Sequence, residues 1–206
     1  GSEMCIRDRW LSLLEEKITD DDDFADLWNE FNNKKIEIIN SLNNERKATR
    51  VTGSEVLNSI GESNRFILGG SADLAASTKQ IISNSIYSHK NRSGQSIEFG
   101  IREHAMAAVV NGITLHSNLI GYGSTFLVFS DYMRPSIRLA SLMNLDSVYI
   151  FTHDSIYLGE DGPTHQPVEH LMSLRLIPGV DVIRPANSIE AQYAYQYIFT
   201  KSNNPK

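Results

Sequence analysis

The sequence predicts an α/β fold in which a doubly wound, mainly parallel sheet is flanked by helices and preceded by an N-terminal helical arm. After residue 50, short apolar runs of strand length alternate with segments whose apolar residues recur at helical spacing. Strands that alternate with helices in this way usually form parallel sheets covered on both faces. The 206 residues suffice for one ordinary domain plus an appendage. Hydrophobic residues make up 41% of the chain, which is enough for a packed core.

The N-terminal part differs in character from the rest. Residues 1–9 show no apolar periodicity and resemble a cloning scar followed by translated adapter DNA, so we expect a non-native leader. From Trp10 onward, apolar residues recur at helical spacing, which predicts a helical linker arm over residues 10–47. The acidic run 20–23 interrupts that pattern. We expect it to provide the N-cap and a favourable charge for a second helix rather than to bind a metal.

Residues 48–206 carry the alternating pattern and form the main predicted domain. The predicted strands are 66–68, 97–99, 119–122, 148–151 and 180–183, and the predicted helices are 54–60, 103–115, 130–143, 167–174 and 188–199. Asn187 and Glu190 stand at the N-cap and capping-box positions of the last helix. The chain stops where a further strand would be expected, so we expect it to be a piece of a longer protein.

Composition argues against several classes of function. The formal net charge is −6 and no basic stripe is present, which argues against nucleic-acid binding. The single cysteine, Cys5, leaves no disulfide framework and no zinc site of the Cys-x-x-Cys kind. Apolar runs are too short for a membrane span or a signal peptide. We therefore expect a cytoplasmic protein that binds neither nucleic acid nor membrane.

Residues 153–167 give the strongest functional signal. This turn-rich segment holds two histidines, three carboxylates, two glycines and two prolines, directly after the apolar run 148–151. In α/β proteins, active sites lie where strands end in such loops. Gly and Pro fix the backbone between His153 and His165, which favours a functional site over a merely solvated loop.

Two further motifs follow predicted strands. Glu103 falls in the first turn of a helix, where it either serves a site or only complements the helix dipole. Phe126, Phe129 and Tyr132 stand three residues apart, and if helical they form one aromatic stripe. Ordinary core packing is the alternative for that stripe.

Two polar residues are ambiguous by themselves. Ser71 follows the strand 66–68 and a pair of glycines, so its hydroxyl could contact an anion. Arg50 could do the same or could be a surface charge.

Taken together, these motifs resemble the transketolase family of thiamine-diphosphate-dependent enzymes. The resemblance runs from Trp10 to the C-terminus and makes residues 48–206 a pyrimidine-binding domain. The segment 159–167 is highly specific within thiamine-diphosphate enzymes, whereas the Glu103 motif alone is typical of the whole superfamily. The motifs that carry the resemblance occur in the family's order at 48–50, 69–74, 99–106, 125–132, 152–167 and 183–186.

The resemblance implies how the cofactor is held. Glu103 is expected to hydrogen-bond N1′ of the aminopyrimidine ring and thereby to help form the cofactor's carbanion. The ring is expected to rest on Phe126, Phe129 and Tyr132, with Phe129 as the main stacking partner. The family's diphosphate is bound with Mg²⁺ or Ca²⁺ by another domain, so no metal ligand is expected in this chain.

The resemblance also implies the substrates, which are sugar phosphates. Arg50, Ser71 and His153 are expected to hold the terminal phosphate, Asp161 to bind a substrate hydroxyl, and His165 to act at the reacting carbonyl. The implied reaction is the transfer of a two-carbon ketol unit from a ketose phosphate to an aldose phosphate, as in the pentose phosphate pathway.

In the family, the complete site lies between this domain and the diphosphate-binding domain of a second subunit. We therefore expect a homodimeric parent, half a site in this chain, and no activity of the chain alone. Tyr157 stands where the family has a small residue, which is expected to reshape the loop locally. One alternative is a domain of the deoxyxylulose-phosphate synthase or 2-oxo-acid dehydrogenase β type, against which 159–167 argues. The other is a non-catalytic assembly module of a split enzyme.

Overall fold

The computed structural model describes residues 2–33, 36, 46–82 and 86–200. The chain forms two compact units, Gly1–Lys35 and Ile36–Lys206.

The first unit consists of two consecutive helices. Helix α1 spans Ser2–Asp20 and α2 spans Asp22–Asn32. The predicted N-cap is confirmed, because the Asp21 carboxylate accepts a hydrogen bond from the Phe24 N–H at 2.9 Å. A hydrogen bond from Lys17, together with that from Phe24, holds the pKa of Asp21 below its ordinary value. The predicted arm continues into residues 37–45, which lie outside the described residues.

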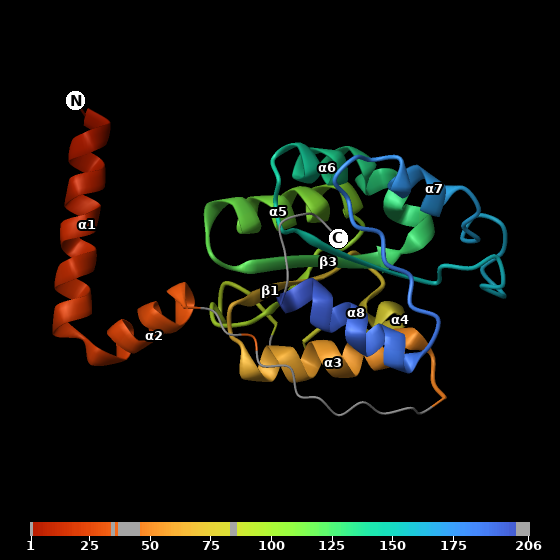
Figure 1. The fold of residues 1–206 in the computed structure, drawn as a ribbon, viewed down its shortest axis with the longest axis horizontal. Coiled ribbons are helices and arrows are strands. Elements are labelled where there is room, and N and C mark those ends of the chain that lie inside the picture. Colours follow the sequence, from red (N-terminus) through yellow and green to blue (C-terminus); the bar gives the residue numbers. More distant parts are fainter. Residues whose placement is uncertain (1, 34–35, 37–45, 83–85, 201–206) are drawn as a thin grey trace. The chain divides into compact units, whose positions relative to one another are not determined.

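The second unit is built on a four-stranded sheet in the order β2-β1-β3-β4, in which every neighbouring pair is parallel (Figure 1). The predicted parallel α/β fold is thereby confirmed. At Gly70, an added Cβ would lie only 1.9 Å from the Ile97 carbonyl oxygen of the neighbouring strand. This glycine is therefore required by the sheet itself. The strands are β1 Ile67–Ser71, β2 Ser96–Glu98, β3 Ile120–Phe126 and β4 Val148–Thr152.

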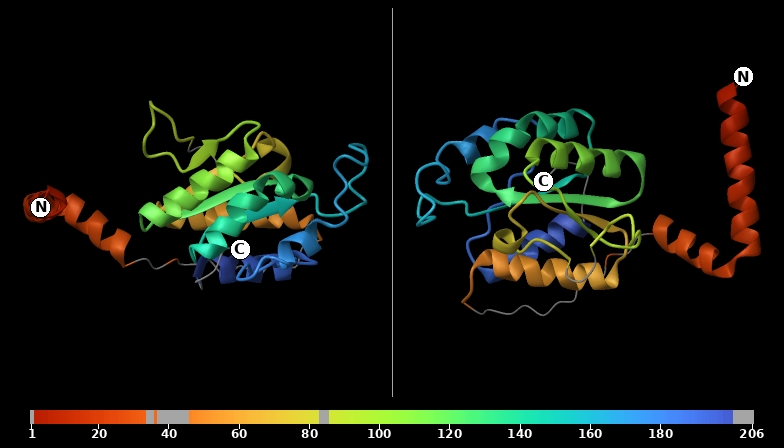
Figure 2. Two further views of the ribbon diagram at one scale, coloured as in Figure 1. Left: turned by 90° about the horizontal axis from the view of Figure 1, so that it is seen from above. Right: turned by 180° about the vertical axis from the view of Figure 1, so that it is seen from behind.

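Helices cover both faces of the sheet, which is the predicted doubly wound arrangement (Figures 1 and 2). Helices α3 and α8 lie on one face, and α5, α6 and α7 lie on the other. The Asn187 side chain accepts from the Glu190 N–H at 2.9 Å, so the predicted cap of the last helix is confirmed. The helices are α3 Thr49–Ser63, α4 Ala75–Thr78, α5 Glu103–His116, α6 Ser130–Leu142, α7 His170–Arg175 and α8 Ser188–Thr200, with a short 3₁₀ helix η1 at Leu127–Phe129.

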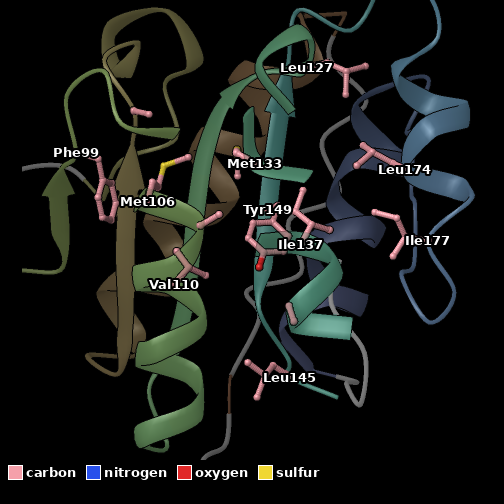
Figure 3. Close-up of a cluster of buried hydrophobic side chains, with 13 residues drawn as sticks. Phe99, Met106, Val110, Leu127, Met133, Ile137, Leu145, Tyr149, Leu174 and Ile177 are labelled. Carbon is pink, nitrogen blue, oxygen red and sulfur yellow. The ribbon is translucent and has the colours of Figure 1, made fainter. Parts of the chain in front are cut away.

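Each helical layer packs on the sheet through its own apolar cluster. On the α5–α6 side, Met106, Val110 and Ile137 belong to one buried cluster with Tyr149 of β4 (Figure 3). On the other side the cluster joins α3, α8 and the sheet through Leu57, Ile60, Ile67, Tyr122, Val148, Tyr195 and Phe199. Burial on both faces explains why the strands appear in the sequence as continuous apolar runs rather than alternating ones.

The strand predicted at 180–183 is wrong, because these residues have no regular secondary structure. Val180 and Val182 do pack against the α5–α6 cluster, so the apolar alternation is real. A cavity lies between this segment and β4, and both line its wall. The side chains therefore reach the core while the backbone stays unpaired with the sheet. None of the described helices is both long and apolar enough to cross a membrane.

Candidate active site

The carboxyl ends of the parallel strands meet at one edge of the sheet. β1 ends at Ser71, β3 at Phe126 and β4 at Thr152, and the residue pairs Ser71–Ser124 and Phe126–Thr152 are in register. The loop that starts at His153 therefore leaves the sheet next to the end of β3, on the edge where α/β folds place their sites.

Phe126, Phe129 and Tyr132 form a continuous ring stack at this edge. Ring centroids lie 6.2 Å apart for Phe126–Phe129 and 6.0 Å for Phe129–Tyr132, with planes inclined by 16° in both pairs. The three residues do not belong to one helix, since Phe126 ends β3, Phe129 ends η1 and Tyr132 lies in the first turn of α6. The predicted stripe exists, but a strand-to-helix transition creates it.

Two histidines of the loop pack on this stack. The His153 ring lies face to face with Phe126, with centroids 3.7 Å apart, and His165 approaches Phe129 edge-on at 5.4 Å. Phe126 is 5% exposed, whereas Tyr132 is 61% exposed. Phe126 thus forms the enclosed base of the stack, and Phe129 and Tyr132 are the rings that a planar ligand could reach.

Arg50 reaches the same place from the start of α3. Its Nη1 donates to His153 Nε2 at 3.4 Å. A guanidinium has no acceptor, so Nε2 must carry the lone pair, and Nδ1–H then donates to Thr152 Oγ1 at 2.8 Å. His153 adopts a left-handed backbone conformation with φ of 53°.

The charges around His153 favour its neutral form. Partial burial is the largest effect that lowers the pKa of His153 below 6.5, and the Arg50 charge lowers it further. Asp161 and Asp154 oppose this shift only in part. The positive charge directly beside the His153 ring therefore belongs to Arg50.

The loop turns back toward the stack through a glycine with positive φ. Gly162 has φ of 78°, and an added Cβ there would meet nothing, so the backbone conformation rather than space requires glycine. The His165 N–H donates to the Gly162 carbonyl at 3.0 Å, and His165 Nδ1 lies 2.9 Å from Thr164 Oγ1. Asp161, beside this turn, is exposed and acts on His153 through its charge.

Glu103 begins α5 and is half-buried. Within the described part of the chain, its carboxylate makes no hydrogen bond or ion pair, so it is free to bind a ligand. The next residue, His104, lies with its Nδ1 3.3 Å from Ser136 Oγ. Ser136 follows Tyr132 by one turn of α6, which holds the start of α5 beside the helix that carries the aromatic stack.

Ser71 is not brought together with Arg50 and His153. It is 2% exposed, its hydroxyl donates to the Ser124 carbonyl at 3.1 Å, and it lies 3.2 Å from Thr78 Oγ1. It is not among the residues that line the cavity beside Arg50. Its assignment to a phosphate stays a prediction.

Arg50 and His153 line a cavity of about 570 Å³, together with Tyr157 and residues that the sequence did not single out for a role. One is Arg184, whose Nε donates to Asp154 Oδ2 at 2.6 Å. Another is Gln80, fully buried, whose Nε2 donates to the Arg50 carbonyl at 2.9 Å. Arg184 is remote in sequence from the loop it contacts, and Gln80 is remote from Arg50. No local pattern could have indicated either contact.

The residues at this edge suit a planar heteroaromatic ligand and a phosphorylated one. Of the three rings, Phe129 is half-buried and Tyr132 is exposed, so these two could contact a flat ring, and the free carboxylate of Glu103 can hydrogen-bond a ring nitrogen. Arg50 provides a fork that matches phosphate oxygens. The arrangement fits the pyrimidine end of thiamine diphosphate and one end of a sugar phosphate.

Comparison with known proteins agrees with this arrangement. Residues 45–206 match the family model described as "Transketolase, pyrimidine binding domain". The transketolase of Physarum polycephalum is 52% identical over 159 residues, and that of Mycobacterium leprae is 49% identical over 167. The matches cover 77% and 76% of this chain but 24% of either relative. The chain thus spans about a quarter of the length of the curated relatives it matches.

Solved structures give the same result. The crystal structure of transketolase from Campylobacter jejuni is 35% identical, with a TM-score of 0.88 over 96% of this chain and 31% of that one. A Pichia stipitis transketolase in complex with sedoheptulose-7-phosphate is 31% identical, with a TM-score of 0.88 over 99% of this chain and 32% of that one.

Proposed function

The chain belongs to the family of transketolase pyrimidine-binding domains, and from this we propose that it forms the pyrimidine-binding part of a thiamine-diphosphate-dependent transketolase. The observation that carries the proposal is the convergence of Arg50, His153 and His165 on the aromatic stack at the carboxyl edge of the sheet. Side chains that can bind a flat ring and side chains that can bind a phosphate therefore lie at the same edge of the sheet.

In this proposal, Glu103 and the aromatic stack serve the cofactor. When bound, thiamine diphosphate supplies a carbon nucleophile that no side chain of the chain offers. Glu103 holds a proton between its carboxylate and N1′ of the aminopyrimidine ring, and Phe129 and Tyr132 hold the ring flat. Phe126 supports Phe129 from the enclosed side of the stack.

The loop and the start of α3 serve the sugar phosphate. Arg50 binds phosphate oxygens. His153 beside it is neutral, so it can form a hydrogen bond to the ligand without adding charge. Ser71 would join them only after its hydroxyl leaves the Ser124 carbonyl. Asp161 binds a substrate hydroxyl, and His165, packed against Phe129, moves a proton at the substrate carbonyl oxygen.

We further propose that the complete enzyme is a cytoplasmic homodimer in which another domain binds the diphosphate with Mg²⁺ or Ca²⁺. Large apolar side chains exposed on α5, α6 and α7 support a subunit or domain interface on that face. These side chains are Val109, Leu115, Leu139, Leu142 and Met172.

The test uses the full-length protein that carries this domain, loaded with thiamine diphosphate and Mg²⁺. We expect ketol transfer from xylulose 5-phosphate to an aldose phosphate and no reaction with pyruvate as donor. Glu103→Gln should nearly abolish kcat while leaving the circular dichroism spectrum unchanged, and Glu62→Gln on exposed α3 surface serves as the matched control. Use of pyruvate alone would favour the synthase or dehydrogenase reading, and an unchanged kcat in Glu103→Gln would remove that residue from its role.

A further inference from the structure

Three metal-ligating side chains meet where α7 begins beside the first turn of α6. Asp131 comes from α6, and Glu169 and His170 come from the start of α7. One ligand atom from each of the three lies within 4.8 Å of the others. His170 Nε2 is 3.2 Å from Asp131 Oδ2, and His170 Nδ1 is 4.0 Å from Glu169 Oε2.

His170 distinguishes this cluster from an ordinary group of surface charges. The residue is 4% exposed, yet within the described part of the chain neither ring nitrogen has a hydrogen-bond partner. Nε2 approaches Asp131 at an ion-pair distance without forming a hydrogen bond. A buried polar group without a partner is disfavoured, so a ligand that satisfies the ring would be stabilised here.

The spacing of the donors is compatible with a shared metal ion. In tetrahedral zinc sites, imidazole nitrogens and carboxylate oxygens lie about 2.0–2.2 Å from the ion, which leaves neighbouring donor atoms about 3.3 Å apart. The observed 3.2 Å between His170 and Asp131 matches that separation. Glu169 is exposed, so its side chain can turn to bring a third donor to the same ion.

We propose that Asp131, Glu169 and His170 bind a divalent transition-metal ion of the Zn²⁺ class. A nitrogen donor beside two carboxylates suits Zn²⁺, Co²⁺ or Mn²⁺ better than Mg²⁺ or Ca²⁺, which prefer oxygen ligands alone. The two carboxylates balance the charge of the ion. Both are exposed, so its remaining coordination positions face water.

The location suggests what the bound ion does. Asp131 directly precedes Tyr132 of the aromatic stack, and Glu169 and His170 follow the end of the loop 153–167. An ion held by both elements would tie the end of the loop to the helix that carries the stack. Binding should therefore raise the thermal unfolding temperature of the chain.

The test measures Zn²⁺ binding to the 206-residue chain by isothermal titration calorimetry, in a Cys5→Ser background that removes the exposed thiol. We expect one ion per chain with a dissociation constant in the micromolar range. Asp131→Asn combined with Glu169→Gln should weaken binding by at least about 10-fold, because two donors are lost. The double variant Asp26→Asn/Glu62→Gln makes the same charge change at exposed positions and should bind normally.

A second measurement identifies the ligand type. Co²⁺ bound at the site should give visible d–d absorption bands that disappear in His170→Gln. If the His170→Gln variant does not fold, the Asp131→Asn/Glu169→Gln variant still tests the proposal, because it changes only exposed side chains. Absence of saturable binding, unchanged affinity in the Asp131/Glu169 double variant, or loss of binding in His165→Gln instead would overturn the proposal.

Discussion

Arg184 contacts Asp154 at two points. Its Nε donates to Asp154 Oδ2 at 2.6 Å, and its Nη2 donates to the Asp154 carbonyl oxygen at 3.1 Å. Asp154 directly follows His153, so this fork fixes the first residues of the loop to the segment that leads into α8. A guanidinium is suited to the task because it presents two donors in one plane.

Arg184→Lys should weaken substrate binding without unfolding the protein. Lysine carries its charge at a single nitrogen and cannot reproduce the fork, so the start of the loop is held less firmly. Both side chains are partly exposed, so the free energy of unfolding should change by less than about 1 kcal/mol. In the full-length enzyme we expect a raised KM for the sugar phosphate. Arg175→Lys on the exposed side of α7 is the control, and an equal KM in both variants would contradict the prediction.

Substitutions along the aromatic stack should separate stability from cofactor binding. Phe126→Ala removes a ring that is 5% exposed and should cost about 3–5 kcal/mol of unfolding free energy. Tyr132→Ala removes an exposed ring and should change stability by about 0.5 kcal/mol. It should still weaken cofactor binding about 5-fold, because an aromatic stacking pair contributes about 1 kcal/mol. Urea unfolding and cofactor titration of the full-length enzyme measure the two effects. A Tyr132→Ala variant with unaltered cofactor affinity would remove this ring from the cofactor site.

His153 should make the chain less stable at mildly acidic pH. Because its folded pKa lies below 6.5, the unfolded chain takes up the proton first as pH falls. The free energy of unfolding should then decrease between pH 6.5 and the lowered pKa, and His153→Gln should flatten that decrease. Imidazole NMR gives the midpoint directly. Arg50→Gln should move the midpoint upward by removing a neighbouring positive charge. A wild-type midpoint at or above 6.5 would show that the ring is not held neutral.

Asn111 should prove essential to the α5–α6 layer. Its Nδ2 donates to the Ser136 carbonyl at 2.8 Å, and its Oδ1 accepts from Ser147 Oγ at 3.0 Å and from the Tyr149 hydroxyl. Burial raises the pKa of the Tyr149 phenol, which keeps it a donor. Asn111→Ala leaves buried polar groups without partners and should cost about 2–3 kcal/mol. Tyr149→Phe removes only one of these bonds and should cost about 1 kcal/mol, both measured by thermal unfolding. Equal losses in the two variants would contradict the role of Asn111 as the shared partner.

The layers of the fold could be predicted well from the sequence, because strands and helices each leave a short-range pattern of apolar residues. Apolar runs located β3 and β4, and the 3.6-residue spacing located α5 and α6. The same reasoning failed at residues 180–183, since alternation reports which side chains face the core and not whether the backbone is paired.

The candidate site was predictable only as far as it is local in sequence. The loop 153–167 and the aromatic residues could be recognised from spacing and resemblance. The stacking of His153 on Phe126 could not, because it depends on the parallel register of β3 and β4 and on a left-handed backbone at His153. The hydrogen bond from the Ser71 hydroxyl could not be predicted for the same reason, because its acceptor, the Ser124 carbonyl, lies on a neighbouring strand.

The place of His153 between Phe126 and Arg50 has a consequence for substrate choice in the proposed enzyme. One face of the ring touches the base of the aromatic stack, and Nε2 touches the guanidinium. In that enzyme, His153 would therefore lie between the aromatic stack that would hold the cofactor and the guanidinium that would bind the phosphate. A substitution that moves His153 would change which carbon chains fit before it changed the chemistry performed on them.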